Sequence, residues 1–160
     1  MNQKKIILVS KSINDYNTIK ESSINKIFTF DYTSHKKLQK LNVYHHIAEN
    51  VLDHNQRVEI FNMAKKFQKW HNDPSLNNFK LKGVNLLGLL DGIELHSLII
   101  KKLIDFFTIK KILEIEEPDF VECSDQMKNI ILLIKKNSDI SNTIKINSKE
   151  KKEELLWDSI

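Results

Sequence analysis

The sequence is poor in the residues that mark several common classes of protein. It has one cysteine, Cys123, so no disulfide can form within the chain and a reducing compartment is expected. None of the three glycines, Gly83, Gly88 and Gly92, follows the first apolar segment, where dinucleotide- and methyl-donor-binding proteins place a glycine-rich turn. No P-loop motif (GxxxxGKS or GxxxxGKT) occurs. These absences argue against a dinucleotide-binding enzyme and a P-loop NTPase, and no cofactor is expected.

Long apolar runs and concentrated charge are also absent. No window approaches the roughly 18 apolar residues of a membrane span, and the N-terminus lacks the apolar length and cleavage site of a signal peptide. The net charge is +4, but lysine is spread along the chain instead of gathering with aromatic residues on one face. We therefore expect a cytoplasmic protein with no transmembrane segment and no nucleic-acid partner.

The residues that bind metals or act as nucleophiles are sparse as well. His45, His46, Glu49 and His54 are close in sequence, but adjacent residues of a strand point to opposite faces, so His45 and His46 are poorly placed to share one ion. No HExxH motif or cysteine pair supports zinc, and no metal site is expected. Cys123 has apolar neighbours, which predicts a buried, inert thiol.

Short apolar segments alternate with segments of helical period. The expected strands are Lys5–Ser10, Lys26–Tyr32, Val43–Asn50, Asp119–Ser124 and Thr143–Ser148. The expected helices are Thr33–Asn42 with Thr33 or Ser34 as its cap, Asn55–His71, Leu86–Glu117 with a bend or break near Phe106–Lys111, and Asp125–Asn137.

This alternation predicts an α/β protein with a Rossmann-like, doubly wound parallel sheet of about five strands. The expected strand order is 3-2-1-4-5, with helices on both faces and right-handed connections. Residues 1–148 are assigned to this domain. Residues 149–160 are expected to begin a helix or linker leading to a second lobe.

In such a sheet, ligands bind outside the carboxyl ends of the strands where the strand order reverses, here between the first and fourth strands. Ser10, Lys11 and Ser12 follow the first strand, and Ser124 and Asp125 follow the fourth. These five residues are the predicted substrate-binding site, since helix N-termini there offer N–H groups to a phosphate or a sugar hydroxyl. The alternative for Ser124 is that it only caps the following helix.

A second group of residues has acid–base chemistry. Asp91, Glu94 and His96 lie near the start of the long apolar helix, where Gly88 and Gly92 leave a bare stripe for close packing. If that end of the helix faces the crevice, one of the three is a candidate catalytic base. The alternative is that Asp91 and Glu94 are first-turn residues favoured by the helix dipole.

Four stretches carry a resemblance to a known family: "KKIILVS", "KFQKWHND", "KGVNLLGLLDGIELHSLIIKKLIDFF" and "ILEIEEPDFVECSD". Over residues 4–137 this pattern resembles the N-terminal half of cytosolic GT-B type glycosyltransferases, particularly those assigned to surface-polysaccharide synthesis. The resemblance implies two Rossmann-like lobes, of which the first binds the acceptor and the second the nucleotide-sugar.

By this resemblance the chain is an acceptor-binding lobe whose ligand is a glycan or another small-molecule acceptor. It is not expected to be catalytic alone, because sugar transfer needs both substrates held between two lobes. One alternative is a stand-alone Rossmann-like binding or interaction domain without enzymatic activity. Its C-terminal helix, carrying Leu155 and Trp157, then packs on a partner or on a second copy to form a homodimer. Another is a small hydrolase or transferase that uses Asp91, Glu94 or His96.

Overall fold

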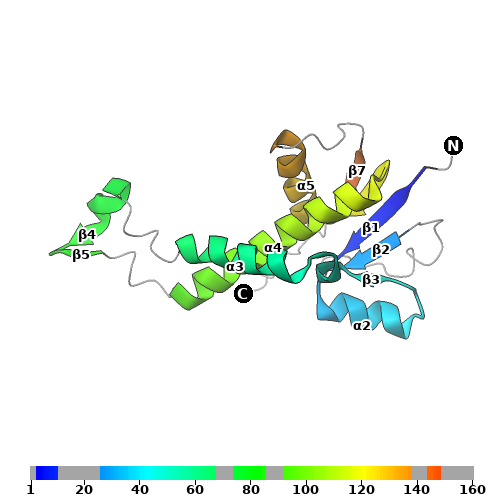
Figure 1. Ribbon diagram of the computed structural model, residues 1–160, viewed down its shortest axis with the longest axis horizontal. Helices are drawn as coiled ribbons and strands as arrows, with labels where there is room; N and C mark the ends of the chain where they lie inside the picture. The colour runs from blue at the N-terminus through cyan, green and yellow to red at the C-terminus, as the bar shows by residue number, and fades with distance from the viewer. Residues whose placement is uncertain (1–2, 11–25, 68–73, 86–91, 138–143, 149–160) are drawn as a thin grey trace, which may run out of the picture. The chain divides into compact units, whose positions relative to one another are not determined.

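The computed structural model of the chain describes residues 3–10, 26–67, 74–85, 92–137 and 144–148. Its main sheet has five strands in the order β3-β2-β1-β6-β7 (Figure 1). The strands are Lys5–Val9 (β1), Lys26–Thr29 (β2), His46–Ile47 (β3), Phe120–Cys123 (β6) and Lys145–Ser148 (β7). Every pairing in this sheet is parallel. Counted along the chain without the separate β4–β5 hairpin, the order is the predicted 3-2-1-4-5, so the doubly wound sheet is confirmed.

The central strand, β1, explains why this sheet forms. Its four apolar residues Ile6–Val9 are at most 1% exposed, as expected for a strand covered on both faces. Ile7 pairs with Ile27 of β2, and Ile6 pairs with Val121 of β6. The predicted neighbours of the first strand are therefore correct, and the order reverses between β1 and β6.

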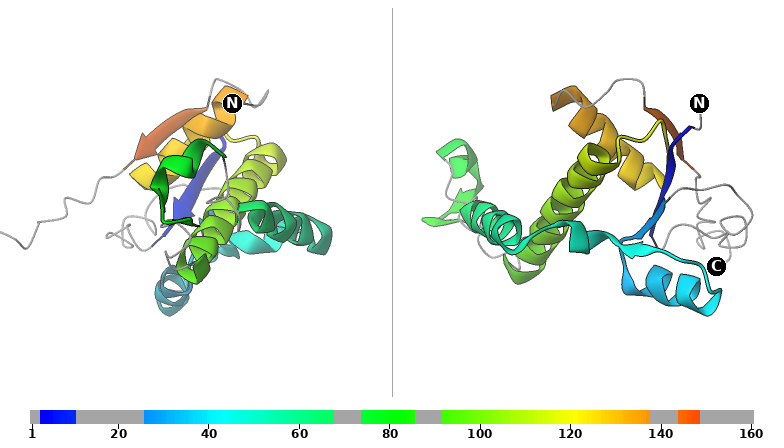
Figure 2. Two further views of the ribbon diagram at one scale, coloured as in Figure 1. Left: turned by 90° about the vertical axis from the view of Figure 1, so that its left-hand side faces the viewer. Right: turned by 45° about the vertical axis from the view of Figure 1, so that its right-hand side comes forward.

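Helices follow the strands. They are Tyr32–Lys40 (α2), His54–Lys66 (α3), Gly92–Glu116 (α4) and Asp125–Asn137 (α5), with short 3₁₀ helices at Ala48–Val51 (η1) and Pro74–Phe79 (η3). α2 and α5 lie on opposite sides of the sheet (Figure 1), as right-handed connections require on the two sides of a reversal in strand order. α5 buries Met127, Ile131 and Ile134, which share one helix face, and it packs beside β7 (Figure 2).

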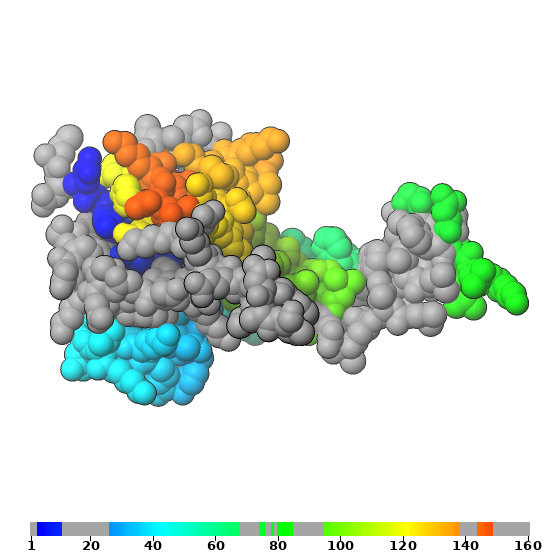
Figure 3. Space-filling view, turned by 180° about the vertical axis from the view of Figure 1, so that it is seen from behind, coloured from blue at the N-terminus to red at the C-terminus, as the bar shows by residue number. Residues whose placement is uncertain are grey.

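β7 is an edge strand of the sheet, bonded to β6 on one side only. Its residues alternate between exposed and partly buried, and Figure 3 shows β7 at the surface beside α5. None of the helices in the described part of the chain combines the length and apolar character that crossing a membrane requires.

Two predicted element boundaries are wrong. The strand predicted over Lys26–Tyr32 ends at Thr29, because Asp31 caps a helix that begins at Tyr32. The Asp31 carboxylate accepts hydrogen bonds from the Ser34 backbone N–H (2.9 Å) and hydroxyl (2.8 Å). Aspartate is a preferred N-cap, and here it takes the place predicted for Thr33 or Ser34. The strand predicted over Val43–Asn50 is likewise reduced to His46–Ile47.

The predicted interruption of the long helix is also wrong. α4 runs from Gly92 to Glu116 as one α-helix, and no glycine or proline lies within residues 93–116 to break it. The helix ends where the sequence predicted, before Pro118. Glu117 adopts a left-handed conformation (φ 43°), and its backbone N–H donates to the Leu113 carbonyl at 3.0 Å.

The chain divides into two compact units. The first comprises residues 1–51 and 109–160 and contains the parallel sheet; the second comprises residues 52–108. Within the second unit, Asp53 and Gln56 form a capping box at the start of α3. A hairpin of Lys80–Leu81 (β4) and Val84–Asn85 (β5) turns on Lys82 (φ 49°) and Gly83 (φ 83°), where the sequence predicted a loop with a short extended piece.

The amino-terminal edge of the sheet is held by a buried carboxylate at the end of α4. Glu116 is 4% exposed, and its two oxygens lie 2.6 Å from Lys26 Nζ and 3.4 Å from Lys4 Nζ. Burial alone would raise the pKa of Glu116, but the hydrogen bonds and charges of Lys26 and Lys4 together hold that pKa below its ordinary value of 4.5. Glu116 thereby links α4 to the strands that begin beside these two lysines.

Candidate functional site

Three of the five predicted substrate-binding residues, Ser10, Ser124 and Asp125, follow the carboxyl ends of β1 and β6. These strands are adjacent and parallel, so Ser10 and Ser124, which follow them, lie at the same edge of the sheet. Ser10 is partly buried. Lys11 and Ser12 lie outside the described residues. The predicted juxtaposition of the two strand ends is therefore present, and the ligand at this edge stays a prediction.

Ser124 has a structural role at this edge. It is 4% exposed, and its hydroxyl accepts a hydrogen bond from the Met127 backbone N–H at 3.4 Å. Its carbonyl accepts the first helical bond of α5, from Lys128 N–H at 2.9 Å. Ser124 thus caps α5, the alternative that the sequence left open. Asp125 is the first residue of that helix and is partly buried.

The three predicted acid–base residues belong to the second unit. Asp91 lies outside the described residues, as does the side chain of Glu94. His96 lies on α4, and its Nδ1 is buried without a hydrogen-bond partner. The catalytic role of these residues stays a prediction.

A cavity opens at the same carboxyl edge, two strands along from the crevice between β6 and β1, where the sequence predicted no site residue. It has a volume of about 220 Å³ and lies at the ends of β2 and β3 and the start of α2. Its lining comes from Thr29, Phe30, Asp31, Tyr32, His35, Ile47 and Glu49. All of these residues belong to the first unit. Thr29 and Ile47 are the last residues of their strands, so the parallel sheet itself builds this cavity.

The lining combines apolar side chains with acidic and hydroxyl groups. Phe30 is buried, whereas the Tyr32 ring is 72% exposed and lies beneath Lys36 Nζ, 5.4 Å from the ring centroid. The two charged groups of the lining, Asp31 and Glu49, are both carboxylates. Their negative charge opposes an anionic ligand at the N-terminus of α2, where a free helix end would attract one.

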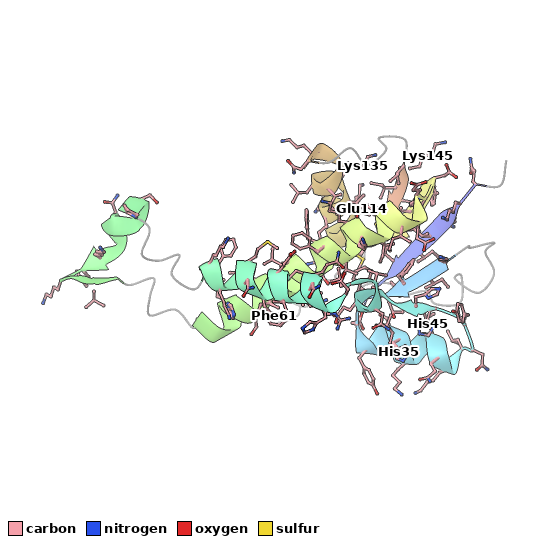
Figure 4. The ribbon with its side chains drawn as sticks, in the orientation of Figure 1. His35, His45, Phe61, Glu114, Lys135 and Lys145 are labelled. Atoms are coloured by element: carbon pink, nitrogen blue, oxygen red, sulfur yellow. The ribbon has the colours of Figure 1, made fainter. Side chains whose placement is uncertain are left out.

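Two histidines meet beside this cavity. Figure 4 shows His35 on α2 close to His45, which lies in the segment before β3. His35 Nδ1 lies 2.8 Å from His45 Nε2, and His45 Nδ1 lies 2.7 Å from the Val43 carbonyl oxygen. The two rings pack edge to face with their centroids 4.9 Å apart. Of the pair, His35 lines the cavity.

The sequence carried little signal for this arrangement. In the sequence, His45 stood out only as an unsuitable metal ligand, and His35 appeared only as a residue of the helix predicted over Thr33–Asn42. The pair forms because the segment that follows α2 folds back along the end of that helix. This segment is held there by the Val43 N–H, which donates to the Leu38 carbonyl at 3.0 Å. Among the described residues, no group of three His, Cys, Asp or Glu side chains could hold a metal ion.

Cys123 lies at the carboxyl end of β6 but offers no nucleophile. The side chain is 1% exposed, as the sequence predicted. Burial and, secondly, the charge of Asp125 raise the pKa of the thiol to about 12. The thiol is therefore protonated at neutral pH and shielded from reagents.

Comparisons with known proteins identify no relative. No family model matches the chain, and neither a curated protein nor a solved structure matches it. The class of protein is therefore defined by the fold and the cavity alone: a Rossmann-like α/β domain with a pocket at the carboxyl edge of its sheet. The resemblance to glycosyltransferase lobes stays a prediction.

Proposed function

We propose that the chain is a binding domain that holds a small, hydroxyl-rich ligand in the cavity at the ends of β2 and β3. In this proposal the ligand is a sugar unit of a glycan acceptor, and the chain is the acceptor-binding lobe of a glycosyltransferase-like protein. The observation that carries the proposal is the lining of this cavity, which combines carboxylates, an imidazole and hydroxyls with apolar side chains.

The position of the cavity supports ligand binding. Open α/β sheets bind ligands outside the carboxyl ends of their strands, most often where the strand order reverses. Thr29 and Ile47 place the cavity at this carboxyl edge, although it lies at β2 and β3 and not at the reversal between β1 and β6. Its volume of about 220 Å³ lies below the range of about 300 to 1,000 Å³ for drug-sized ligands. A single sugar ring matches this size better than a whole nucleotide-sugar does.

The charge of the lining favours a glycan acceptor over a nucleotide-sugar donor as the ligand. In this proposal the Glu49 carboxylate accepts hydrogen bonds from sugar hydroxyls, whereas both oxygens of Asp31 already accept from Ser34. The negative charges of both residues repel the phosphates of a nucleotide-sugar. The chain also lacks the glycine-rich turn that would let a pyrophosphate approach the backbone. An acceptor role without catalysis follows, because group transfer requires a donor held beside the acceptor. The alternative, an interaction domain that dimerises through Leu155 and Trp157, depends on residues outside the described part of the chain.

An amide NMR titration tests the proposal. Methyl glycosides of glucose, galactose and N-acetylglucosamine are added to the protein, with inorganic phosphate as the anionic comparison. We expect glycoside-induced shifts at Thr29, Tyr32 and Ile47, and none from phosphate at these positions. Shifts of equal size from phosphate, or no glycoside shift at the cavity, contradict the proposal.

A matched pair of variants locates the binding. Ile47 lines the cavity and is 44% exposed, whereas Leu132 lies on α5 and is 47% exposed. Ile47→Trp fills the cavity and should abolish the shifts. Leu132→Trp adds the same ring at a similarly exposed site in the same unit and should leave them unchanged. Equal effects of the two variants would place the ligand elsewhere.

A further inference from the structure

We propose that His45 fixes the protonation pattern of His35, so that His35 Nε2 presents a lone pair that accepts a hydrogen bond from a hydroxyl of the bound ligand. His35 is then a binding residue, and His45 is a positioning residue that acts through it. The hydroxyl recognition rests on the proposed function, whereas the arrangement of the two rings stands on its own geometry.

The chain of hydrogen bonds begins at a backbone carbonyl. The Val43 oxygen only accepts, so the His45 Nδ1 that lies 2.7 Å away must carry a proton. The opposite neutral form of His45 would set a bare nitrogen lone pair against that oxygen, which is repulsive. Neutral His45 therefore has its lone pair on Nε2.

The next link determines the state of His35. Because His45 Nε2 accepts, the His35 Nδ1 that lies 2.8 Å away must donate and therefore carries a proton. Neutral His35 then has its lone pair on Nε2. The Val43 carbonyl thus determines, through two hydrogen bonds in series, which nitrogen of the cavity-lining histidine accepts.

The neighbours of His35 determine which ligand group suits this lone pair. The charged side chains that line the cavity beside it are Asp31 and Glu49, and both oxygens of Asp31 already accept from Ser34. The Tyr32 ring of the same helix lies 6.4 Å from the His35 ring, centroid to centroid. A ligand hydroxyl donates to an imidazole lone pair. A carboxylate has no proton to give, and any anion, phosphate included, meets the repulsion of the two carboxylates.

The protonation pattern can be measured without any ligand. The nitrogen chemical shifts of both imidazole rings are recorded at about pH 8, where histidine side chains are ordinarily neutral. We expect His35 and His45 both to carry their proton on Nδ1. A His35 ring with its proton on Nε2 overturns the inference, whether or not a glycoside binds.

Variants then test what His45 does for His35. His45→Phe keeps a ring beside His35 but removes its acceptor, so His35 is released to carry its proton on Nε2. We expect the His35 nitrogen shifts to change accordingly and the methyl glycoside to bind about 3- to 10-fold more weakly, the loss of one hydrogen bond. His54→Phe, at an exposed residue of α3 in the second unit, is the control and should change neither quantity.

Substitutions of His35 complete the test. His35→Ala removes the acceptor and should weaken glycoside binding by the same factor, whereas His35→Gln keeps a polar group near the position of Nε2 and should restore part of it. If His45→Phe leaves the His35 protonation pattern unchanged, the inference is wrong. If no glycoside binds even the unaltered protein, the proposed function and the hydroxyl recognition fail together, while the ring-nitrogen shifts still decide the arrangement of the pair.

Discussion

Replacing Glu116 by glutamine should weaken the first unit measurably, because this buried carboxylate holds two lysines at the amino-terminal edge of the sheet. Removing one partner of a fully buried ion pair costs about 3 to 5 kcal/mol, whereas exposed pairs contribute about 0 to 1 kcal/mol. Glu116 is 4% exposed, but the side chains of Lys26 and Lys4 are 41% and 40% exposed, so solvent screens the pairs. Glutamine also keeps one accepting oxygen. We therefore expect Glu116→Gln to lower the free energy of unfolding by about 1 to 2 kcal/mol.

Urea unfolding followed by far-ultraviolet circular dichroism measures this change. With a slope of about 2 kcal/mol per molar urea, the midpoint should fall by about 0.5 to 1 M. Glu114→Gln is the matched control on the same helix. Glu114 is 42% exposed and lies 3.9 Å from Lys110, so its loss should cost less than about 0.5 kcal/mol.

The pH dependence of the stability lost in Glu116→Gln provides a second check. The pKa of Glu116 is lower in the folded protein than its ordinary value of 4.5, so its stabilisation is complete above that value and is lost as the pH falls through the lowered pKa. The difference in the free energy of unfolding between the unaltered protein and Glu116→Gln should therefore be constant near neutral pH and should disappear in acid. Equal losses of stability for the Glu116 and Glu114 variants, or a stability difference that persists in strong acid, would contradict this role of Glu116.

Two further predictions concern the carboxyl edge of the sheet. Cys123 should resist iodoacetamide in the native protein at neutral pH, since burial raises the pKa of its thiol to about 12. Mass spectrometry should find labelling only as urea unfolds the chain, and rapid labelling of the native protein would contradict the burial of Cys123. Asp31→Ala should cost about 1 kcal/mol in urea unfolding because α2 loses its cap, while Asp31→Asn should retain most of that stability; equal losses for the two variants would contradict the capping role.

The sheet could be predicted because its signal is local. The apolar run Ile6–Val9 needs cover on both faces, and its alternation with helical segments leaves few arrangements other than a doubly wound sheet. Element ends were harder, because Asp31 reads equally well as the end of a strand or the cap of a helix. The hydrogen bonds to Ser34 decide between the two, and they exist only once the chain turns.

Only the edge of the sheet on which the cavity lies could be predicted from the sequence. Strand polarity indicates the carboxyl ends, but the sequence favoured the crevice between β1 and β6, where Ser124 caps α5. The His35–His45 contact joins residues ten positions apart through the packing of one helix against its own extension. No hydrophobic period records such a contact, so it could not be found before the fold was known.

The most direct test of sugar binding in the cavity is a search for contacts between methyl groups of the protein and the ring protons of a bound methyl glycoside, by nuclear Overhauser spectroscopy. Ile47 lines the cavity, whereas Leu132 and Leu133 are similarly exposed on α5. Binding in the cavity predicts cross-peaks from the sugar to the Ile47 methyl groups and none to those two leucines. Cross-peaks to the leucines alone, or none to Ile47 with the glycoside in large excess, would contradict it.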